Sequence, residues 1–388
     1  MPAFPDTLPL LFWAGVVLVV YTYGIYPVVI WTFANIFARP RPAPREMDTD
    51  LPTVSLLIAA HNEESVIGAR LENALSSDYP ADKLEIVVAS DGSRDQTAAI
   101  ARDFAGRGVR LLDYKQRRGK AGVLNAAFSE LTGELVVLSD ANTGTDRSAI
   151  RKLVRWFQDA EVGVVCGRLI LTDPRTGRNV DSMYWKYETF LKKCENRLGG
   201  LLGANGGIYA IRRNLFRPID PNTIVDDFVL PLSIKLHTGC EIVYDADAVA
   251  HEETPATIAS EFGRRCRIGA GDFQSIPVLW PLLNPARGWI AFTFLSHKVL
   301  RWLCPFFLLG ILLINAFLLD STLYQVTFAL QIALYVTAAA GSLLSGSGLL
   351  GRSIRLTTLF TTVNLALLVG FWRWISGPQR GTWERTAR

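Results

Sequence analysis

Acidic side chains follow or interrupt three apolar, β-branched stretches of this sequence. They are Asp91 in Ser-Asp-Gly-Ser, Asp140 in Ser-Asp-Ala-Asn, and the adjacent pair Asp226 and Asp227. A basic cluster, Arg264-Arg265-Cys266-Arg267, lies farther along the chain. An open α/β sheet binds its ligands outside the carboxyl ends of its strands, so we expect the carboxylates to emerge there. The sequence therefore predicts chemistry at a cleft.

The elements that must position these side chains alternate between strand and helix patterns. Short apolar runs predict buried strands at 53–60, 84–90, 109–113, 135–139, 162–171 and 240–250. The stretches between them predict helices that begin near residue 63 and lie at 95–104, 121–131 and 181–197. Such alternation predicts an α/β fold, a mostly parallel, Rossmann-like sheet covered by helices on both faces.

Long apolar runs flank this polar middle. The 388 residues are 49% hydrophobic with a mean hydropathy of +0.22, which is high for a purely soluble protein. Runs long enough to cross a bilayer of about 30 Å lie at 10–38, 303–319, 323–344 and 356–375. The first is too long for a signal peptide and lacks a small-residue cleavage pattern, so we interpret it as a retained anchor.

Basic residues predict the orientation of these runs. Arg39, Arg41 and Arg45 follow the first run, which places the middle of the chain on the cytoplasmic side of the cell (inner) membrane. One span before the middle and three after it leave the basic tail, 380–388, outside. Either the tail breaks the positive-inside rule or the number of spans is wrong by one.

Four regions follow from these patterns. Residues 1–45 form an anchor and a Pro-rich linker, and residues 46–260 form a cytosolic α/β domain. Residues 261–302 contain amphipathic interface helices with tryptophans, and residues 303–388 contain three spans and the tail.

Cysteine count and net charge exclude other classes of protein. Five scattered cysteines in a cytosolic setting argue against a disulfide framework, and we interpret them as small buried residues. The net charge of +4 comes without a basic-aromatic array, so no nucleic-acid partner is expected. Membrane lipids or a phosphate ligand account for this charge.

Taken together, the motifs resemble the family of inverting nucleotide-sugar glycosyltransferases that includes cellulose, chitin and hyaluronan synthases and ceramide glucosyltransferase. The resemblance covers nearly the whole chain and implies a GT-A fold and a UDP-sugar donor. It places Ala60, Asn62 and Glu63 in the first nucleotide-binding loop, and it matches Asp91 to the aspartate that binds uracil. An Asp-Gly pair alone is more often only a turn.

The resemblance also implies a diphosphate site with a divalent cation. Lys120, at a helix start after the basic loop 116–119, would meet the diphosphate, although a solvated charge run is the alternative. Asp140 and Asn142 occupy the place of an Asp-x-Asp motif that holds Mg²⁺ or Mn²⁺, here with an amide as second group. His251 is a candidate further ligand, although a lone histidine is more often structural.

The acid pair implies the catalytic step. Asp226 and Asp227 match the family's acid pair, whose second member is the general base. Asp227 would deprotonate the acceptor hydroxyl as it attacks the anomeric carbon opposite the leaving diphosphate, and this single displacement inverts the carbon. The alternative is that the pair caps a helix from Phe228 onward.

The basic cluster resembles the family's Gln-x-x-Arg-Trp motif. Arg267 takes the place of the arginine that contacts the diphosphate, and Arg264 replaces the glutamine on the donor side. Ile268 replaces the tryptophan that lies beneath the acceptor sugar in polymerising synthases. That replacement weakens the case for processive synthesis.

The acceptor is the open part of the prediction. Gly206 and Gly207 would approach it, and Trp383 resembles a residue of the synthases' gating segment. We favour a growing β-linked polysaccharide exported between the helices, with export or assembly partners, over a membrane lipid glycosylated once. A different class is a nucleotide-sugar-binding regulator whose catalysis has lapsed, but retention of Asp227 and Arg267 argues against it.

Overall fold

The structure, a computed structural model, describes residues 7–38, 42–47, 49–172, 183–254, 258–341 and 348–377. It divides into two compact units, which we describe separately. The sheet unit contains Ile30–Ser260 and Gln274–Thr293. The helical unit contains the residues before Ile30 together with Glu261–Phe273 and Phe294–Gly377.

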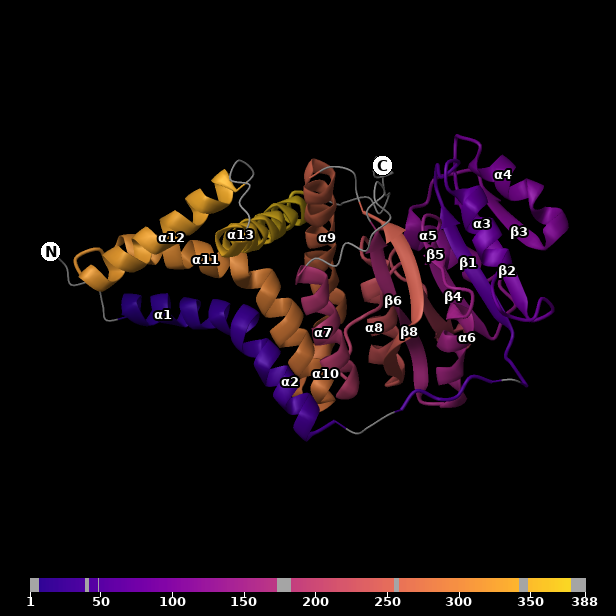
Figure 1. Cartoon of the computed structure of the whole chain (residues 1–388), viewed down its shortest axis with the longest axis horizontal. Coiled ribbons are helices and arrows are strands. Elements are labelled where there is room, and N and C mark those ends of the chain that lie inside the picture. The colour runs from indigo at the N-terminus through magenta and orange to yellow at the C-terminus, as the bar shows by residue number, and fades with distance from the viewer. Residues whose placement is uncertain are drawn as a thin grey trace. The chain divides into compact units, whose positions relative to one another are not determined.

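A mixed β-sheet forms the centre of the sheet unit (Figure 1). Among the described residues its strands are β1 (Val54–Ala60), β2 (Leu84–Asp91), β3 (Val109–Tyr114), β4 (Leu135–Asp140), β5 (Gly144–Thr145), β6 (Val162–Thr172), β7 (Tyr209–Arg212) and β8 (Glu241–Glu253). They lie in the order β3-β2-β1-β4-β7-β6-β8-β5. β1 pairs parallel with β2 and β4, β2 with β3, and β6 with β8, whereas β7 runs antiparallel to β4 and β6, and β5 to β8. The predicted α/β sheet is confirmed, with antiparallel strands inserted.

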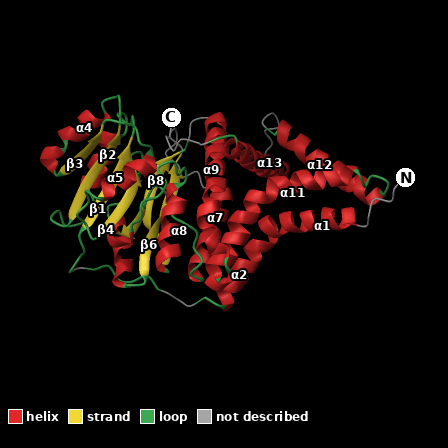
Figure 2. Cartoon of the chain, turned by 180° about the vertical axis from the view of Figure 1, so that it is seen from behind, coloured by secondary structure: helices red, strands yellow, loops and turns green. Residues whose placement is uncertain are grey.

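Helices lie on both faces of this sheet (Figures 1 and 2). They are α3 (Ile67–Leu75), α4 (Thr97–Asp103), α5 (Lys120–Phe128), α6 (Ala149–Val154), α7 (Met183–Arg197) and α8 (Asp226–Thr238). The main core joins Ile58 and Val137 of the sheet to Leu71 of α3 and Leu153 of α6, all almost fully buried. Strands buried on both faces read as continuous apolar runs, which is why their positions were predictable.

Apolar helices make up most of the helical unit. The chain contains α1 (Thr7–Val20), α2 (Tyr26–Ile36), α9 (Ile258–Leu279), α10 (Trp289–Thr293), α11 (Leu300–Ala316), α12 (Thr322–Ala340) and α13 (Gly348–Ile375). In the described residues, four helical stretches are long and apolar enough to cross a membrane: Thr7–Ile36, Trp289–Ala316, Thr322–Ala340 and Leu350–Ile375. The second begins earlier than predicted because α10 and the π-helical turn Phe294–Val299 continue into α11.

The end of α13 packs closely against α9. A methyl group at Gly370 would lie 2.7 Å from the backbone nitrogen of Ala270, so only glycine allows this approach. Phe273 of α9 makes an edge contact with Phe371, with ring centroids 5.1 Å apart. The basic cluster predicted to be cytoplasmic lies on α9, one to two turns before these contacts.

We therefore expect the end of α13 to lie on the cytoplasmic side, which requires that the number of membrane crossings after the middle differs by one from the predicted three. In a cysteine-free background, Ser376→Cys should react with a membrane-impermeant maleimide in inverted vesicles and stay unlabelled in intact cells. Ser376 follows α13 and is exposed, so the reagent has access to it. Labelling in intact cells would instead place the end of α13 outside.

Candidate active site

Three elements of the sheet unit bring Lys120 between two carboxylates. Asp140 ends β4, Lys120 begins α5, and Asp226 begins α8. Lys120 Nζ lies 2.8 Å from Asp140 Oδ1 and 3.3 Å from Asp226 Oδ2. Burial by itself lowers the pKa of Lys120, but Asp140, Asp226 and Asp227 outweigh it and raise the pKa well above 10.5. The ammonium group is thus the fixed positive charge of the site.

Asp226 is the most buried carboxylate of this group, since its side chain is only 6% exposed. The pKa of Asp226 is raised from 3.8 to about 6, with burial as the largest cause; Lys120 lowers it, and Asp227 and Asp140 raise it. The predicted strand end is wrong here, because the pair opens α8 instead. No side chain caps that helix, so the capping alternative does not describe the pair either.

The raised pKa predicts a pH-dependent stability. Above about pH 6 the folded protein bears the cost of a buried Asp226 charge, and this cost disappears as the pH falls from 6 towards 3.8. Asp226→Asn should therefore have a higher free energy of unfolding than wild type at pH 7.5, by about 1 to 3 kcal/mol, and this difference should shrink as the pH falls towards 3.8. Thermal unfolding of both proteins across this range tests it, with Asp82→Asn, an exposed change, as control. A difference that does not vary with pH would contradict the assignment.

Gly206 lies between the functional carboxylates. Its backbone N–H donates a hydrogen bond to Asp227 Oδ2 at 2.8 Å. A methyl group on Gly206 would lie 3.3 Å from Asp140 Oδ2, 3.3 Å from Asp227 Oδ2 and 3.6 Å from Lys120 Nζ. Asp140, Asp227 and Lys120 therefore converge on one point, and glycine leaves that point open. Asp227 is half-buried, so its carboxylate remains accessible to a ligand.

The side chain of Asp91 holds the backbone of the basic loop, residues 116–119. Its carboxylate is fully buried and accepts hydrogen bonds from the backbone N–H groups of Arg118 at 2.6 Å and Gly119 at 3.0 Å. Gly92 has φ +61°, and a methyl group there would lie 2.9 Å from the backbone nitrogen of Arg117. Asp91 thus lies beside the predicted donor loop, where it holds the backbone that precedes Lys120.

The first predicted nucleotide loop is braced to the loop after β2. Asn62 has φ +55°, and its Oδ1 accepts a hydrogen bond from the backbone N–H of Arg94 at 2.8 Å. The Glu63 N–H donates to Thr97 Oγ1 at 2.7 Å, and helix α3 begins only at Ile67. Ala60 is fully buried at the end of β1. These contacts fix the loops that follow the carboxyl ends of β1 and β2.

The predicted cation ligands separate into two groups. Asn142 follows β4, and its Nδ2 donates to Glu252 Oε1 at 3.0 Å, whereas His251 Nε2 contacts Asp146 Oδ1 at 3.1 Å. Within the described residues no cluster of three His, Cys, Asp or Glu side chains is arranged to hold a metal. The protein oxygens of Asp140 and Asn142 suit a hard cation that takes its other ligands from phosphates and water.

Comparison with known proteins agrees with this geometry. Residues 55–219 match the family described as Glycosyl transferase family 2. The chain contains a family 2 glycosyl transferase domain. The prediction of a glycosyltransferase domain is therefore confirmed for residues 55–219.

Two relatives differ in the acceptor that their names imply. The chain is 26% identical over 288 residues to the beta-monoglucosyldiacylglycerol synthase of Trichormus variabilis, covering 69% of this chain and 59% of that protein. It is also 26% identical over 336 residues to the poly-beta-1,6-N-acetyl-D-glucosamine synthase of Staphylococcus epidermidis, covering 79% and 78%. The chain thus matches less than two thirds of the cyanobacterial protein.

A solved structure confirms the fold. The mannosyltransferase PcManGT from Pyrobaculum calidifontis, in complex with GDP-Man and Mn²⁺, has a TM-score of 0.71 at 23% identity. The match covers 94% of this chain and 99% of that one. The predicted GT-A-type domain with apolar helices is therefore confirmed as architecture.

The remaining predicted site residues belong to other parts of the chain. Arg264 pairs with Glu261 on α9 at 2.8 Å, Arg267 is exposed, and Ile268 is half-buried, all in the helical unit. Their contacts with donor and acceptor stay predictions. Trp383 lies outside the described residues. Gly207 accepts a hydrogen bond from Ser139 Oγ at 2.8 Å, which joins the glycine stretch to β4.

Sequence reasoning missed two side chains beside the candidate site. Tyr209 on β7 is 1% exposed, and burial raises its pKa well above 10, with Asp226 adding to the effect. Glu252 contacts Asn142. β7 was not predicted because it is four residues long and follows a glycine-rich stretch, and Glu252 lies just past the predicted strand 240–250.

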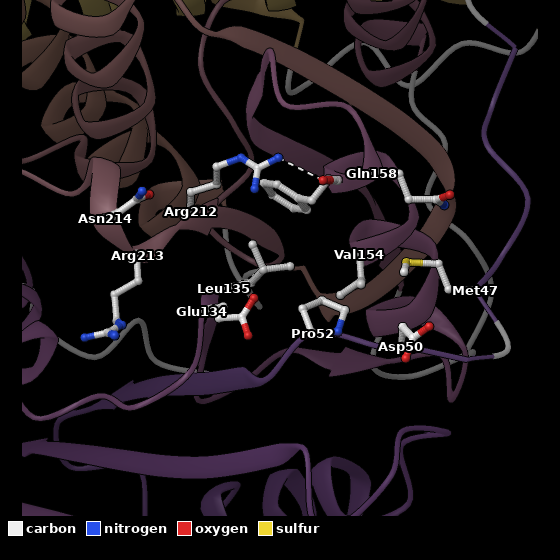
Figure 3. Close-up of a pocket in the computed structure, with 11 residues that line it drawn as sticks. Met47, Asp50, Pro52, Glu134, Leu135, Val154, Gln158, Arg212, Arg213 and Asn214 are labelled. Carbon is white, nitrogen blue, oxygen red and sulfur yellow. Dashed lines mark hydrogen bonds between the residues drawn. The ribbon is translucent and has the colours of Figure 1, made fainter.

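A pocket of about 340 Å³ lies at the other end of the strands, away from Asp140 (Figure 3). It is lined by Pro52 before β1, Leu135 at the start of β4, and Arg212 at the end of β7. Arg212 donates hydrogen bonds to the carbonyl oxygens of Phe157 at 2.8 Å and Asp159 at 2.9 Å. Ligands of α/β sheets bind at the carboxyl ends of the strands, and this pocket lies at the other end. We therefore interpret Arg212 as a residue that stabilises the backbone at Phe157 and Asp159.

Proposed function

We propose that the chain transfers a sugar from a UDP-sugar to an acceptor hydroxyl with inversion of the anomeric carbon. The observation that carries this proposal is the convergence of Asp140, Asp227 and Lys120 around Gly206. At one open point it brings together the half-exposed carboxylate of Asp227, the ammonium group of Lys120 and a carboxylate oxygen of Asp140. The uridine part of the donor follows from the resemblance of the Ser90–Ser93 segment and is part of the proposal.

Asp227 is the proposed general base. It takes the proton of the acceptor hydroxyl as the oxygen bonds to the anomeric carbon, and the bond to the diphosphate breaks with its electron pair. The Gly206 N–H fixes one oxygen of this carboxylate, which restricts its rotation. Asp226 is buried against Lys120 and is proposed to hold that lysine rather than to meet the acceptor.

The leaving diphosphate carries the charge that the site must neutralise. Lys120 is placed to meet it, with Arg264 and Arg267 as proposed further contacts from the helical unit. Asp140 and Asn142 would hold Mg²⁺ or Mn²⁺, which supplies positive charge to the departing diphosphate. The Mn²⁺ in the mannosyltransferase structure supports a divalent cation, and the choice between the two ions is open.

A growing β-linked polysaccharide is the proposed acceptor, with synthesis at the cytoplasmic face of the inner membrane coupled to export. The support is the N-acetylglucosamine polymer synthase, because the alignment covers 79% of this chain and 78% of that protein. The four candidate spans would supply the membrane part. Gly206 lies at the open point where an acceptor would enter, whereas Gly207 is buried, and a methyl group there would lie 2.9 Å from Leu169 Cδ1.

A membrane lipid glycosylated once is the second candidate. Buried polar side chains of the apolar helices bond to neighbouring helices rather than standing apart: Asn364 contacts Tyr23 at 3.2 Å, and Asn315 contacts Thr327 at 3.1 Å. A polymer channel needs a polar path, and these contacts use polar groups for helix packing. Ile268 in place of a tryptophan favours the same candidate. A non-catalytic regulator is disfavoured by the family match and by the retention of Asp227 and Arg267.

Product mass separates these candidates. The purified full chain in lipid vesicles is incubated with radiolabelled UDP-sugars, a GDP-sugar arm and Mn²⁺ or Mg²⁺, with Asp227→Asn as control. Long polymer supports polysaccharide synthesis, and a singly labelled lipid supports the second candidate. Transfer only from the GDP-sugar would overturn the uridine assignment. Absence of transfer from every donor would contradict the proposed function.

A further inference from the structure

Glu252 contacts Asn142 across 110 residues of chain. Asn142 follows β4, and Glu252 lies near the end of β8. Side chains alternate between the faces of a strand, so the neighbours of Glu252 point the other way. His251 contacts Asp146, and Glu253 is exposed. Glu252 is therefore the residue of this stretch that reaches Asn142.

The contact fixes the orientation of the Asn142 amide. An asparagine side chain has a carbonyl oxygen that accepts and an NH₂ group that donates. Because a carboxylate only accepts, the NH₂ end must face Glu252, as the 3.0 Å distance from Nδ2 to Oε1 shows. The carbonyl oxygen then lies on the side away from Glu252. A hard cation binds the carbonyl oxygen and not the NH₂ group.

The contact also places a negative charge beside Asn142, the position where the resembling family has a second aspartate. Asn142 is neutral where a second aspartate would carry charge, so a cation there has only Asp140 as its charged ligand on this motif. Glu252 places a carboxylate one hydrogen bond behind the amide. Hydrogen-bonded carboxylates behind metal ligands orient them and strengthen binding.

We propose that Glu252 is a positioning residue for the divalent cation of the transfer reaction. It orients the carbonyl oxygen of Asn142 toward the cation that Asp140 holds, and it supplies the missing negative charge from behind. This inference rests on the proposed function, because that function places the cation at Asp140 and Asn142.

A purely structural role makes a different prediction. If Glu252 only fastens the loop after β4 to β8, its removal lowers the unfolding temperature and leaves cation affinity unchanged. Cation affinity and thermal unfolding are therefore both measured on the same purified full chain.

The test is a Mn²⁺ titration in the presence of saturating UDP, with free Mn²⁺ followed by electron paramagnetic resonance. Glu252→Ala should weaken Mn²⁺ binding by about 10- to 100-fold, the usual effect of removing a carboxylate behind a metal ligand. Glu253→Gln is the matched control, since it removes the same charge one residue away on the other face, and its affinity should equal that of wild type.

An exchange variant tests the chemistry directly. Asn142→Asp combined with Glu252→Gln moves the charge onto the ligand and reverses the hydrogen bond, with the glutamine NH₂ as donor. It should bind Mn²⁺ within about threefold of wild type, against the loss in Glu252→Ala. An exchange variant as weak as Glu252→Ala would overturn the inference.

Two further outcomes would also overturn it. Glu252→Ala with wild-type Mn²⁺ affinity, whether or not it unfolds at lower temperature, would assign Glu252 a structural role only. A wild-type chain that transfers sugar but binds no Mn²⁺ or Mg²⁺ would remove the cation and this inference with it, and would leave the assignment of Asp227 intact.

Discussion

Replacing Asp227 with asparagine should lower the turnover of sugar transfer by about 10²- to 10⁴-fold, the usual contribution of a general base. Asparagine has the same shape, and its carbonyl oxygen can still accept the Gly206 hydrogen bond that Asp227 accepts at 2.8 Å. It cannot take the acceptor proton. The change therefore removes the proposed chemistry and leaves the arrangement of the site.

Two measurements on the full chain check this prediction. Turnover should fall as stated, whereas the Kd for UDP should stay within about threefold of wild type. The change removes proton transfer from the acceptor and not the binding of the nucleotide. Asp82 is an exposed carboxylate far from Asp227 in the sequence, so Asp82→Asn is the control and should retain full turnover. Undiminished transfer by Asp227→Asn would exclude Asp227 as the base.

Lys120→Met should destabilise the protein and weaken donor binding. Methionine keeps the length of the side chain but leaves Asp140 and Asp226 without the ammonium group that lies 2.8 Å and 3.3 Å away. Removing one partner of a buried ion pair typically lowers the free energy of unfolding by about 3–5 kcal/mol. The loss should shrink below pH 6, because Asp226 then takes up a proton.

Lys115→Met provides the matched control. Its ammonium group is 82% exposed and pairs with Asp113 at the surface, so its loss should change stability by less than about 0.5 kcal/mol. Denaturant titration of both variants in detergent, followed by tryptophan fluorescence, compares them. Equal stability of the two variants would show that the lysine is not needed to hold the acid group together.

Local sequence signals were sufficient for most of the sheet. The runs that form β1, β2 and β4 are short, apolar and buried on both faces, so burial alone marks them and places Asp91 and Asp140 at their carboxyl ends. β7 escaped prediction because its position in the sheet depends on pairing with β4 and β6. The start of α8 escaped because the acid pair was expected at a strand end.

The roles of the site residues depended on contacts far apart in the sequence. The resemblance placed both Lys120 and Asp140 at the diphosphate, but their direct contact is seen only in the structure. The buried position of Asp91, with its carboxylate bonded to the backbone of Arg118 and Gly119, could not be anticipated either. The Asn142 and Glu252 contact joins two segments that share no local pattern, so only the folded chain brings it into view.

Asp91 holds the basic loop, residues 116–119, through the backbone N–H groups of Arg118 and Gly119. The backbone conformation of this loop therefore depends little on its side chains. Every residue except proline offers the backbone N–H that Asp91 accepts from Arg118, whereas Gly119, at φ +78°, is the one position that favours glycine. Arg117 and Arg118 are exposed and can vary without loosening the backbone. If the proposed function holds, these two side chains can therefore change, by evolution or by design, while the scaffold that carries Lys120 stays the same.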